Sequence, residues 1–218
     1  KVKLSDKAKA DIEDFEKNGN SLVLTAVDGQ LKILMGVRDQ IRPGVKEDLE
    51  KLRKLGVKNL IMLSGDNQGT VDLVSRQLGL TEAYGNMLPE DKSEYIKKLK
   101  EKGQIVAFVG DGVNDSPSLA LADIGIAMGS GTDVAIETSD VVLMNSDFSR
   151  LPHALGLVKA TARNMKQNIF IAVGVVIILL ASVLFSDWMN MSIGMLVHEG
   201  SILAVILNGM RLLRYKLR

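Results

Sequence analysis

Short apolar runs alternate with amphipathic stretches over most of this chain. The runs at 57–63 and 104–109 predict buried parallel strands. A helical pattern follows the first run to Leu78 and stops at Gly79. A second helical pattern starts at Pro89, a residue suited to the first turn of a helix. This alternation of strands and helices predicts an α/β fold.

The hydrophobic pattern changes after Gln167. Residues 169–185 form an apolar run of 17 residues without a charged side chain, which meets the lower limit for a membrane-spanning helix. A second apolar segment, 191–210, follows a short polar link in which Trp188 suits the membrane interface. Basic residues bracket the pair, so we expect a transmembrane hairpin with both ends in the cytoplasm. These are Arg163 and Lys166 before it, and Arg211, Arg214, Lys216 and Arg218 after it.

The segment GDGVNDSPSL at 110–119 carries the clearest chemical signal. It follows a predicted strand, and open α/β sheets bind ligands at the carboxyl ends of their strands. Asp111 and Asp115 provide carboxylates that suit Mg²⁺, which in turn binds phosphate. The glycines beside Asp111, Gly110 and Gly112, allow a tight turn and close approach by a bulky group. The alternative is a plain polar turn, which the same residue types favour.

The strand predicted at 57–63 ends in Ser64, Gly65 and Asp66. A serine hydroxyl at a strand end can donate to a phosphoryl oxygen, and the next helix offers free N–H groups. The same residues also make an ordinary capped turn. Lys92, in the helix that starts at Pro89, can reach the same phosphate as a point charge, although most lysines are simply solvated.

Together these motifs resemble the haloacid-dehalogenase phosphotransfer fold, and more closely the phosphorylation domain of P-type ATPases. The resemblance rests on Ser64-Gly65-Asp66 (the family more often has Thr at the first position), Pro89-x-x-Lys92, the loop 110–115, and the segment 122–137. It implies that Asp111 binds Mg²⁺, with Asp115 as second choice, and that Ser64 and Lys92 hold the phosphoryl group. It further implies catalytic roles for Gly65, Asp66, Asn114 and Asp115, and cofactor or nucleotide contacts for Asp39, Arg42, Gly110 and Gly112.

The nucleophile of that family, an aspartate in Asp-Lys-Thr-Gly-Thr, does not occur in this sequence. The chain opens at Lys1 in a polar helical stretch. We therefore expect the C-terminal portion of a longer protein, unable to complete a phosphorylation cycle alone. The expected parts are the end of a nucleotide-binding domain (1–36), a phosphorylation domain (37–150), a linker helix (151–167), and the hairpin with a basic tail (168–218).

The second apolar segment contains His198, Glu199 and Ser201. A charged side chain at mid-membrane costs about 2.5–3.5 kcal/mol, so Glu199 needs a cation, a proton or a buried partner. His198 and Ser201 share one helix face, and Glu199 lies about 100° round from His198. Imidazole with carboxylate suits Zn²⁺, Co²⁺ or Fe²⁺ better than Cu⁺. The alternative is a neutral His–Glu hydrogen bond that fastens two helices.

The string His198–Ser201 also resembles a signature of the cobalt/iron/zinc-type subgroup of heavy-metal (type IB) P-type ATPases. The string at 207–213 resembles the end of the last spanning helix in the same subgroup. Ile202 stands where that subgroup usually has Thr. The resemblance implies that His198, Glu199 and Ser201 bind the transported metal.

Composition adds two exclusions. The net charge of +1 gives no electrostatic reason for a nucleic-acid partner, and a chain without cysteine has neither a disulfide nor a thiolate metal site. The resemblance predicts ATP-driven efflux of a divalent metal, with Mg²⁺, ATP, the lipid bilayer and the rest of the parent chain as partners. The expected location is a bacterial or archaeal cell membrane, multi-pass, with the phosphorylation domain in the cytoplasm. The alternatives are a membrane-tethered phosphatase of the same fold and a non-enzymatic truncated regulator of a full pump.

Overall fold

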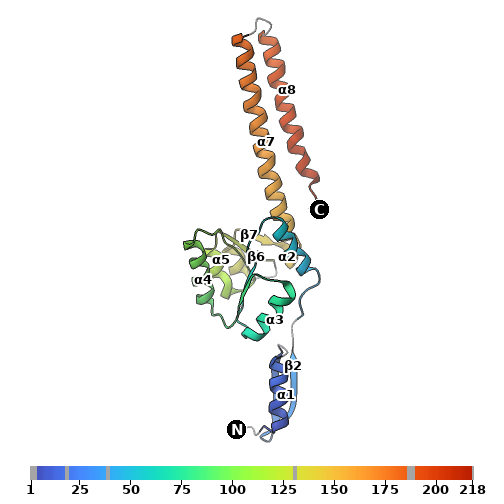
Figure 1. The fold of residues 1–218 in the computed structure, drawn as a ribbon, viewed down its shortest axis with the longest axis vertical. Coiled ribbons are helices and arrows are strands. Elements are labelled where there is room, and N and C mark those ends of the chain that lie inside the picture. The colour runs from blue at the N-terminus through green and yellow to red at the C-terminus, as the bar shows by residue number, and fades with distance from the viewer. Residues whose placement is uncertain (1–3, 18–19, 38–39, 130–131, 186–189, 218) are drawn as a thin grey trace. The chain divides into compact units, whose positions relative to one another are not determined.

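The computed structural model divides into two compact units, Lys1–Arg150 and Leu151–Arg218 (Figure 1). Among the described residues, the strands all lie in the first unit, and the second is formed mainly by two long helices. The described residues are 4–17, 20–37, 40–129, 132–185 and 190–217.

The first unit opens with a helix and a β-hairpin: α1 (Asp6–Lys17), β1 (Ser21–Val27) and β2 (Gln30–Val37). The strands are antiparallel and joined at Asp28 and Gly29, whose φ angles of 51° and 75° fit a two-residue Asp-Gly turn. Phe15 of α1 lies over Gly36 of β2, where a Cβ would come within 2.6 Å of the phenyl ring. The helix therefore packs directly on the hairpin.

The rest of the first unit has two parallel sheets, one of order β3-β4 and one of order β5-β6-β7. Helices connect successive strands, so the predicted α/β fold is confirmed. The strands are β3 (Ile61–Leu63), β4 (Glu82–Tyr84), β5 (Ala107–Gly110), β6 (Ile124–Met128) and β7 (Val141–Leu143). The helices are α2 (Val45–Lys54), α3 (Gln68–Leu78), α4 (Pro89–Glu101), α5 (Ser116–Leu121) and α6 (Asp133–Glu137), with 3₁₀ turns η1 (Val113–Asp115) and η2 (Met144–Ser146).

Both strands predicted at the sequence level are shorter than expected. In the middle of the predicted 57–63 strand, the N–H of Leu60 donates to the Thr81 hydroxyl at 3.0 Å, and β3 begins only at the next residue. The N–H of Gln104 donates back to Leu99, so the chain there still belongs to the end of α4. The apolar runs therefore located both strands but overestimated their length.

The two helix boundaries follow local signals. Gly79 ends α3 in the left-handed conformation, with φ 66° and ψ 40°, as a C-terminal glycine does. Pro89 occupies the first turn of α4, and the Asp91 carboxylate accepts from the N–H of Leu88 at 2.9 Å. The predictions of a stop at Gly79 and a start at Pro89 are confirmed.

The core of this unit lies between α4, α5 and the second sheet. Ile96 and Leu119 are each 1% exposed, and Ala127 is fully buried. At Gly125 of β6, a Cβ would lie 2.5 Å from the carbonyl oxygen of Leu119, so only glycine lets α5 lie this close to the strand. Burial of these apolar side chains fixes α4 and α5 beside the loop that follows β5.

The second unit contains α7 (Arg150–Phe185), α8 (Met191–Met210) and the 3₁₀ turn η3 (Arg211–Arg214). Both long helices have the length and apolar composition needed to cross a membrane. The predicted linker helix and first span form one continuous helix of 36 residues. His153 lies in the part of that helix predicted as the linker, and its ring is 5.6 Å from that of Tyr215. Trp188, expected in the link between the spans, lies outside the described residues.

A carboxylate between β4 and α4 provides a test of this fold. Tyr95 and Tyr84 both donate to one oxygen of Glu82, at 2.7 and 2.8 Å. The Tyr95 hydrogen bond, followed by that of Tyr84, lowers the pKa of Glu82. Because the folded-state pKa lies below the unfolded one, these bonds stabilise the fold above the unfolded pKa, and the stabilisation is lost as pH falls through the folded pKa.

We expect Tyr95→Phe to raise the pKa of Glu82 and to destabilise the protein at neutral pH but not at strongly acid pH. Carboxyl carbon NMR over a pH titration measures the first effect, and urea unfolding at two pH values measures the second. The matched variant Tyr84→Phe should shift the pKa of Glu82 less. A Glu82 pKa unchanged in Tyr95→Phe contradicts the assignment.

Candidate functional site

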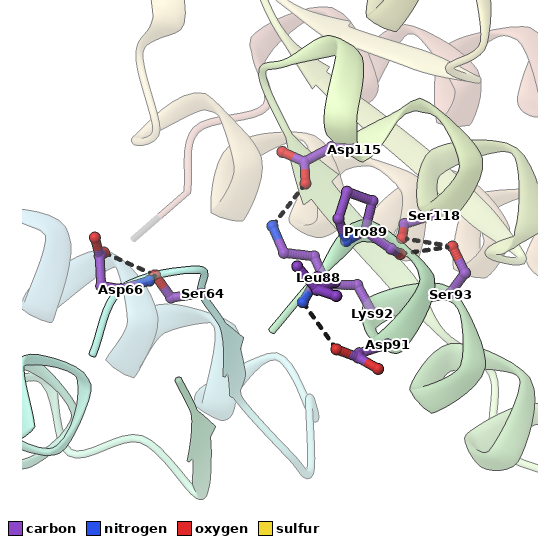
Figure 2. Close-up of polar contacts among 9 residues, drawn as sticks. All are labelled: Ser64, Asp66, Leu88, Pro89, Asp91, Lys92, Ser93, Asp115 and Ser118. Atoms are coloured by element: carbon purple, nitrogen blue, oxygen red, sulfur yellow. Dashed lines mark hydrogen bonds and ion pairs between the residues drawn. The ribbon is translucent and has the colours of Figure 1, made fainter. Parts of the chain in front are cut away.

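An ion pair between Lys92 and Asp115 forms the centre of the candidate site (Figure 2). The ammonium nitrogen lies 2.9 Å from the carboxylate oxygen Oδ1, and each side chain is only 15% exposed. Partial shielding from water makes such a pair stronger than one at the surface. Lys92 comes from the first turn of α4 and Asp115 from the turn before α5, so the pair joins two separate segments.

Helix geometry places Lys92 at this position. Pro89 and the cap between Leu88 and Asp91 set the first turn of α4. The Ser93 hydroxyl donates to the carbonyl of Pro89 and lies 3.2 Å from the hydroxyl of Ser118, which is fully buried (Figure 2). The contact between Ser93 and Ser118 therefore ties α4 to α5 next to the ion pair.

Gly110 gives Asp115 the space it occupies. A Cβ at Gly110 would lie 2.7 Å from the Cβ of Asp115 and 3.0 Å from its Oδ2. The sequence predicts that a bulky group approaches Gly110 closely, and the side chain of Asp115 is one such group. Gly112 is less constrained, because its Cβ would meet nothing nearer than 3.9 Å, and its carbonyl accepts from the N–H of Asp115 at 3.1 Å.

Asp111 follows β5 directly and exposes its side chain. Its carbonyl accepts from the N–H of Thr132 at 3.3 Å, which ties the loop to the start of α6. In the described part of the chain its carboxylate has no hydrogen-bond partner, and no cluster of three His, Cys, Asp or Glu residues occurs there. Mg²⁺ commonly takes one or two carboxylates and completes its shell with water and phosphate oxygens, so Asp111 fits such a site.

Ser64 and Asp66 form a compact turn after β3. The hydroxyl of Ser64 donates to the Asp66 carboxylate at 2.8 Å and accepts from the N–H of Asp66 at 3.2 Å. The N–H groups of Asn86 and Met87 donate to the carbonyls of Asp66 and Ser64 at 2.6 and 3.0 Å. Gly65 lies inside this turn, which is held to the loop after β4 by backbone hydrogen bonds.

The structure brings together some of the predicted site residues but not all of them. Lys92 and Asp115 are in contact, and Asp111 lies on the same loop as Asp115. Figure 2 shows Ser64 and Asp66 apart from this pair, and within the described ranges no hydrogen bond joins the two groups. Asn114 is exposed.

The predicted nucleotide-coupling residues are described only in part. Asp39 lies outside the described residues. Arg42 precedes α2, and its carbonyl accepts from the N–H of Val45 at 3.4 Å.

Three supporting residues, Ser93, Ser118 and Thr132, were missed at the sequence level. Ser93 follows Lys92 directly, and Ser118 lies one helical turn after Asp115. This spacing could have indicated that the same two segments make a second contact. Thr132 gave no comparable signal, because its backbone contact with Asp111 joins positions far apart in the sequence.

The predicted membrane residues lie together on α8. The Ser201 hydroxyl donates to the carbonyl of His198 at 2.6 Å, which uses its hydrogen but leaves oxygen lone pairs available. The side chains of His198 and Glu199 are exposed and have no hydrogen-bond partner among the described residues. The neutral His–Glu hydrogen bond considered above is therefore not formed between these two side chains.

Known proteins with similar sequences and folds fit this arrangement. A family model described as haloacid dehalogenase-like hydrolase matches residues 1–123. The chain is 42% identical over 201 residues to a zinc-transporting ATPase of Bacillus subtilis (strain 168), covering 92% of this chain and 31% of that protein. It is 46% identical over 158 residues to copper-transporting ATPase 1 of Rhizobium meliloti (strain 1021), covering 72% of this chain and 19% of that protein.

The fold also matches a crystal structure of a zinc-transporting PIB-type ATPase in the E2.Pi state. The TM-score is 0.85 at 36% identity, over 97% of this chain and 34% of that one. The chain thus spans about a third of the length of these two zinc-transporting proteins. The parallel sheets, the loop with Asp111 and Asp115, and the family match over residues 1–123 show that the chain belongs to the haloacid dehalogenase-like hydrolase family, and over most of its length it is similar to heavy-metal-transporting P-type ATPases.

Proposed function

We propose that this chain is part of an ATP-driven exporter of a divalent transition metal that works through an aspartyl-phosphate. The observation that supports this most directly is that one chain combines a Lys–Asp phosphate-type site with two membrane-length helices, the second of which carries His198 and Glu199. The γ-phosphoryl group of ATP passes to an aspartate carboxylate, ADP leaves, and water later cleaves the acyl phosphate.

Asp111 is the proposed Mg²⁺ ligand, and Asp115 is the second choice because Lys92 already engages one of its oxygens. When bound, Mg²⁺ neutralises charge on the transferred phosphoryl group. Lys92 has three N–H donors, so it can keep Asp115 and still donate to a phosphoryl oxygen. Ser64 exchanges its hydrogen bond with Asp66 for one to the phosphoryl group.

The aspartate nucleophile lies outside this chain in the proposed mechanism. The absence of Asp-Lys-Thr-Gly-Thr and the coverage of about a third of the zinc-transporting relative support this. Among the described residues, β3 and β5 each pair with a strand on one side only, so each sheet has an open edge where a further strand can add.

The membrane site is proposed to include His198, Glu199 and Ser201. A cation at this position offsets the cost of placing Glu199 in the membrane. Imidazole with carboxylate favours zinc, cobalt or iron(II) over copper(I). The zinc-transporting relatives support a divalent cargo, and the proposed location is a bacterial cell membrane with the phosphorylation domain in the cytoplasm.

The two alternatives explain less of the chain. A tethered phosphatase uses the same Lys92 and Asp111 but gives no role to Glu199. A non-enzymatic regulator needs no shielded Lys92–Asp115 pair and no buried Ser93–Ser118 contact.

We expect Asp111→Asn to abolish phosphoenzyme formation from ATP in the full transporter, because it removes the charge proposed to hold Mg²⁺. Phosphorylation with labelled ATP measures this, and a thermal unfolding curve like that of the wild type serves as the control for folding. Normal phosphoenzyme levels would remove Asp111 from the Mg²⁺ site.

Lys92→Ala should slow phosphoenzyme formation about a hundredfold, the usual effect of removing one charged donor from a transition state. Lys100→Ala is the matched control, because Lys100 lies on the same helix and pairs with Asp123 at 3.0 Å, further along α4. Equal effects of the two variants would show that Lys92 supports only the fold.

His198→Ala should remove metal-stimulated ATP turnover but leave phosphorylation by inorganic phosphate intact, because the phosphate site is unchanged. Turnover is measured with Zn²⁺, Co²⁺, Fe²⁺ and Cu⁺ in turn. His153→Ala, the only other histidine variant available in this chain, should keep the stimulation. Metal stimulation that survives in His198→Ala contradicts the transport site.

A further inference from the structure

Three asparagines join α7 to α8 where the charged and apolar parts of the helices meet. Asn164 and Asn168 are four residues apart on α7, so they lie on one face. They flank the change from the basic segment with Arg163 and Lys166 to the uncharged run that follows. Asn208 lies near the end of α8. We call Asn164, Asn168 and Asn208 the asparagine clasp.

The hydrogen bonds of the asparagine clasp form a closed circuit. Asn164 Nδ2 donates to the backbone carbonyl of Asn208 at 2.7 Å, and Asn168 Nδ2 donates to Asn164 Oδ1 at 3.1 Å. Asn208 Nδ2 donates to Asn168 Oδ1 at 2.8 Å and so completes it. Asn164 is only 7% exposed. Each side-chain amide donates within the circuit.

The clasp also reaches the end of α8. The helix ends at Met210 and tightens into the 3₁₀ turn Arg211–Arg214, where the carbonyl of Asn208 accepts from the backbone N–H of Arg211. Asn164 is a second donor to that carbonyl, from the other helix. Arg211 Nη1 donates to Asn208 Oδ1 at 3.1 Å and orients the remaining amide group.

These hydrogen bonds determine the register and rotation of α8 against α7, which apolar contacts alone do not determine. In lipid there is no hydrophobic force between helices, and the facing Leu, Ile and Val side chains fit several registers almost equally well. An amide circuit forms in one register and one rotation only. The height of α8 relative to α7 is therefore set at Asn208, ten residues or about 15 Å along the helix from His198.

We propose that Asn164, Asn168 and Asn208 are positioning residues for transport, which hold α8 in the register that presents His198 and Glu199 to the metal. This rests on the proposed function. The clasp touches neither metal nor phosphate, so it acts through helix placement alone. Its loss should weaken metal recognition and leave phosphate chemistry unchanged.

The test uses the full transporter with Asn168→Ala, which removes two bonds of the circuit. We expect the Zn²⁺ concentration for half-maximal ATP turnover to rise about threefold, as the loss of one interhelical hydrogen bond in a membrane implies, since the other lost bond lies within α7. Phosphorylation by inorganic phosphate should be unchanged. Spin labels at Val173→Cys and Leu203→Cys should give a broader distance distribution than in the wild type.

The matched control is Gln167→Ala, which removes an amide next to the clasp; in the described part of the chain its side chain makes one longer bond, of 3.3 Å, to Asn208. It should leave both readouts at wild-type values. The double variant Asn168→Ala/Asn208→Ala should be no worse than the stronger single variant, because both break the same circuit.

An unchanged label distance and unchanged Zn²⁺ dependence in Asn168→Ala overturn the proposal, as do strictly additive effects. Loss of phosphorylation by inorganic phosphate in Asn168→Ala would indicate a general structural role and also overturns it. A wild-type protein without metal stimulation refutes the proposed function instead, and the label distances then still decide whether the clasp fixes the two helices.

Discussion

The ion pair between Lys92 and Asp115 holds together the two segments that form the candidate phosphate site. Neither segment is rigid alone, because α4 begins after an irregular loop and α5 has only six residues. The pair is shielded by its surroundings, and breaking it would leave a charge partly removed from water. Gly110, which leaves space for the Asp115 side chain, and the buried Ser93–Ser118 contact serve the same arrangement.

Polar groups also determine the geometry of the two long helices, α7 and α8. They set the register of one helix against the other, which apolar packing does not. Two helices of Leu, Ile and Val have no preferred register in lipid, and in this hairpin an amide circuit near the charged ends supplies one. In both units, a few satisfied polar contacts set the geometry, and apolar burial or lipid supplies most of the stabilisation.

The short motifs were the most informative part of the sequence because each encodes local backbone geometry. Gly79 and Pro89 gave helix boundaries, and the loop 110–119 gave the position of two carboxylates at a strand end. Strand lengths were overestimated, because hydrogen bonds from Leu60 and Gln104 to distant or preceding residues end the pairing early. Apolar runs alone do not encode those partners.

The sequence by itself determined the α/β class, two membrane-length helices, and which residue types carry the chemistry. Periodicity, capping and charge are properties of neighbouring residues and can be read without coordinates. Only the tertiary structure decided that Lys92 pairs with Asp115, that Gly110 makes room for that aspartate, and that Asn208 closes a circuit with α7. Each of these depends on segments distant in sequence, whose contact follows from packing rather than from local pattern.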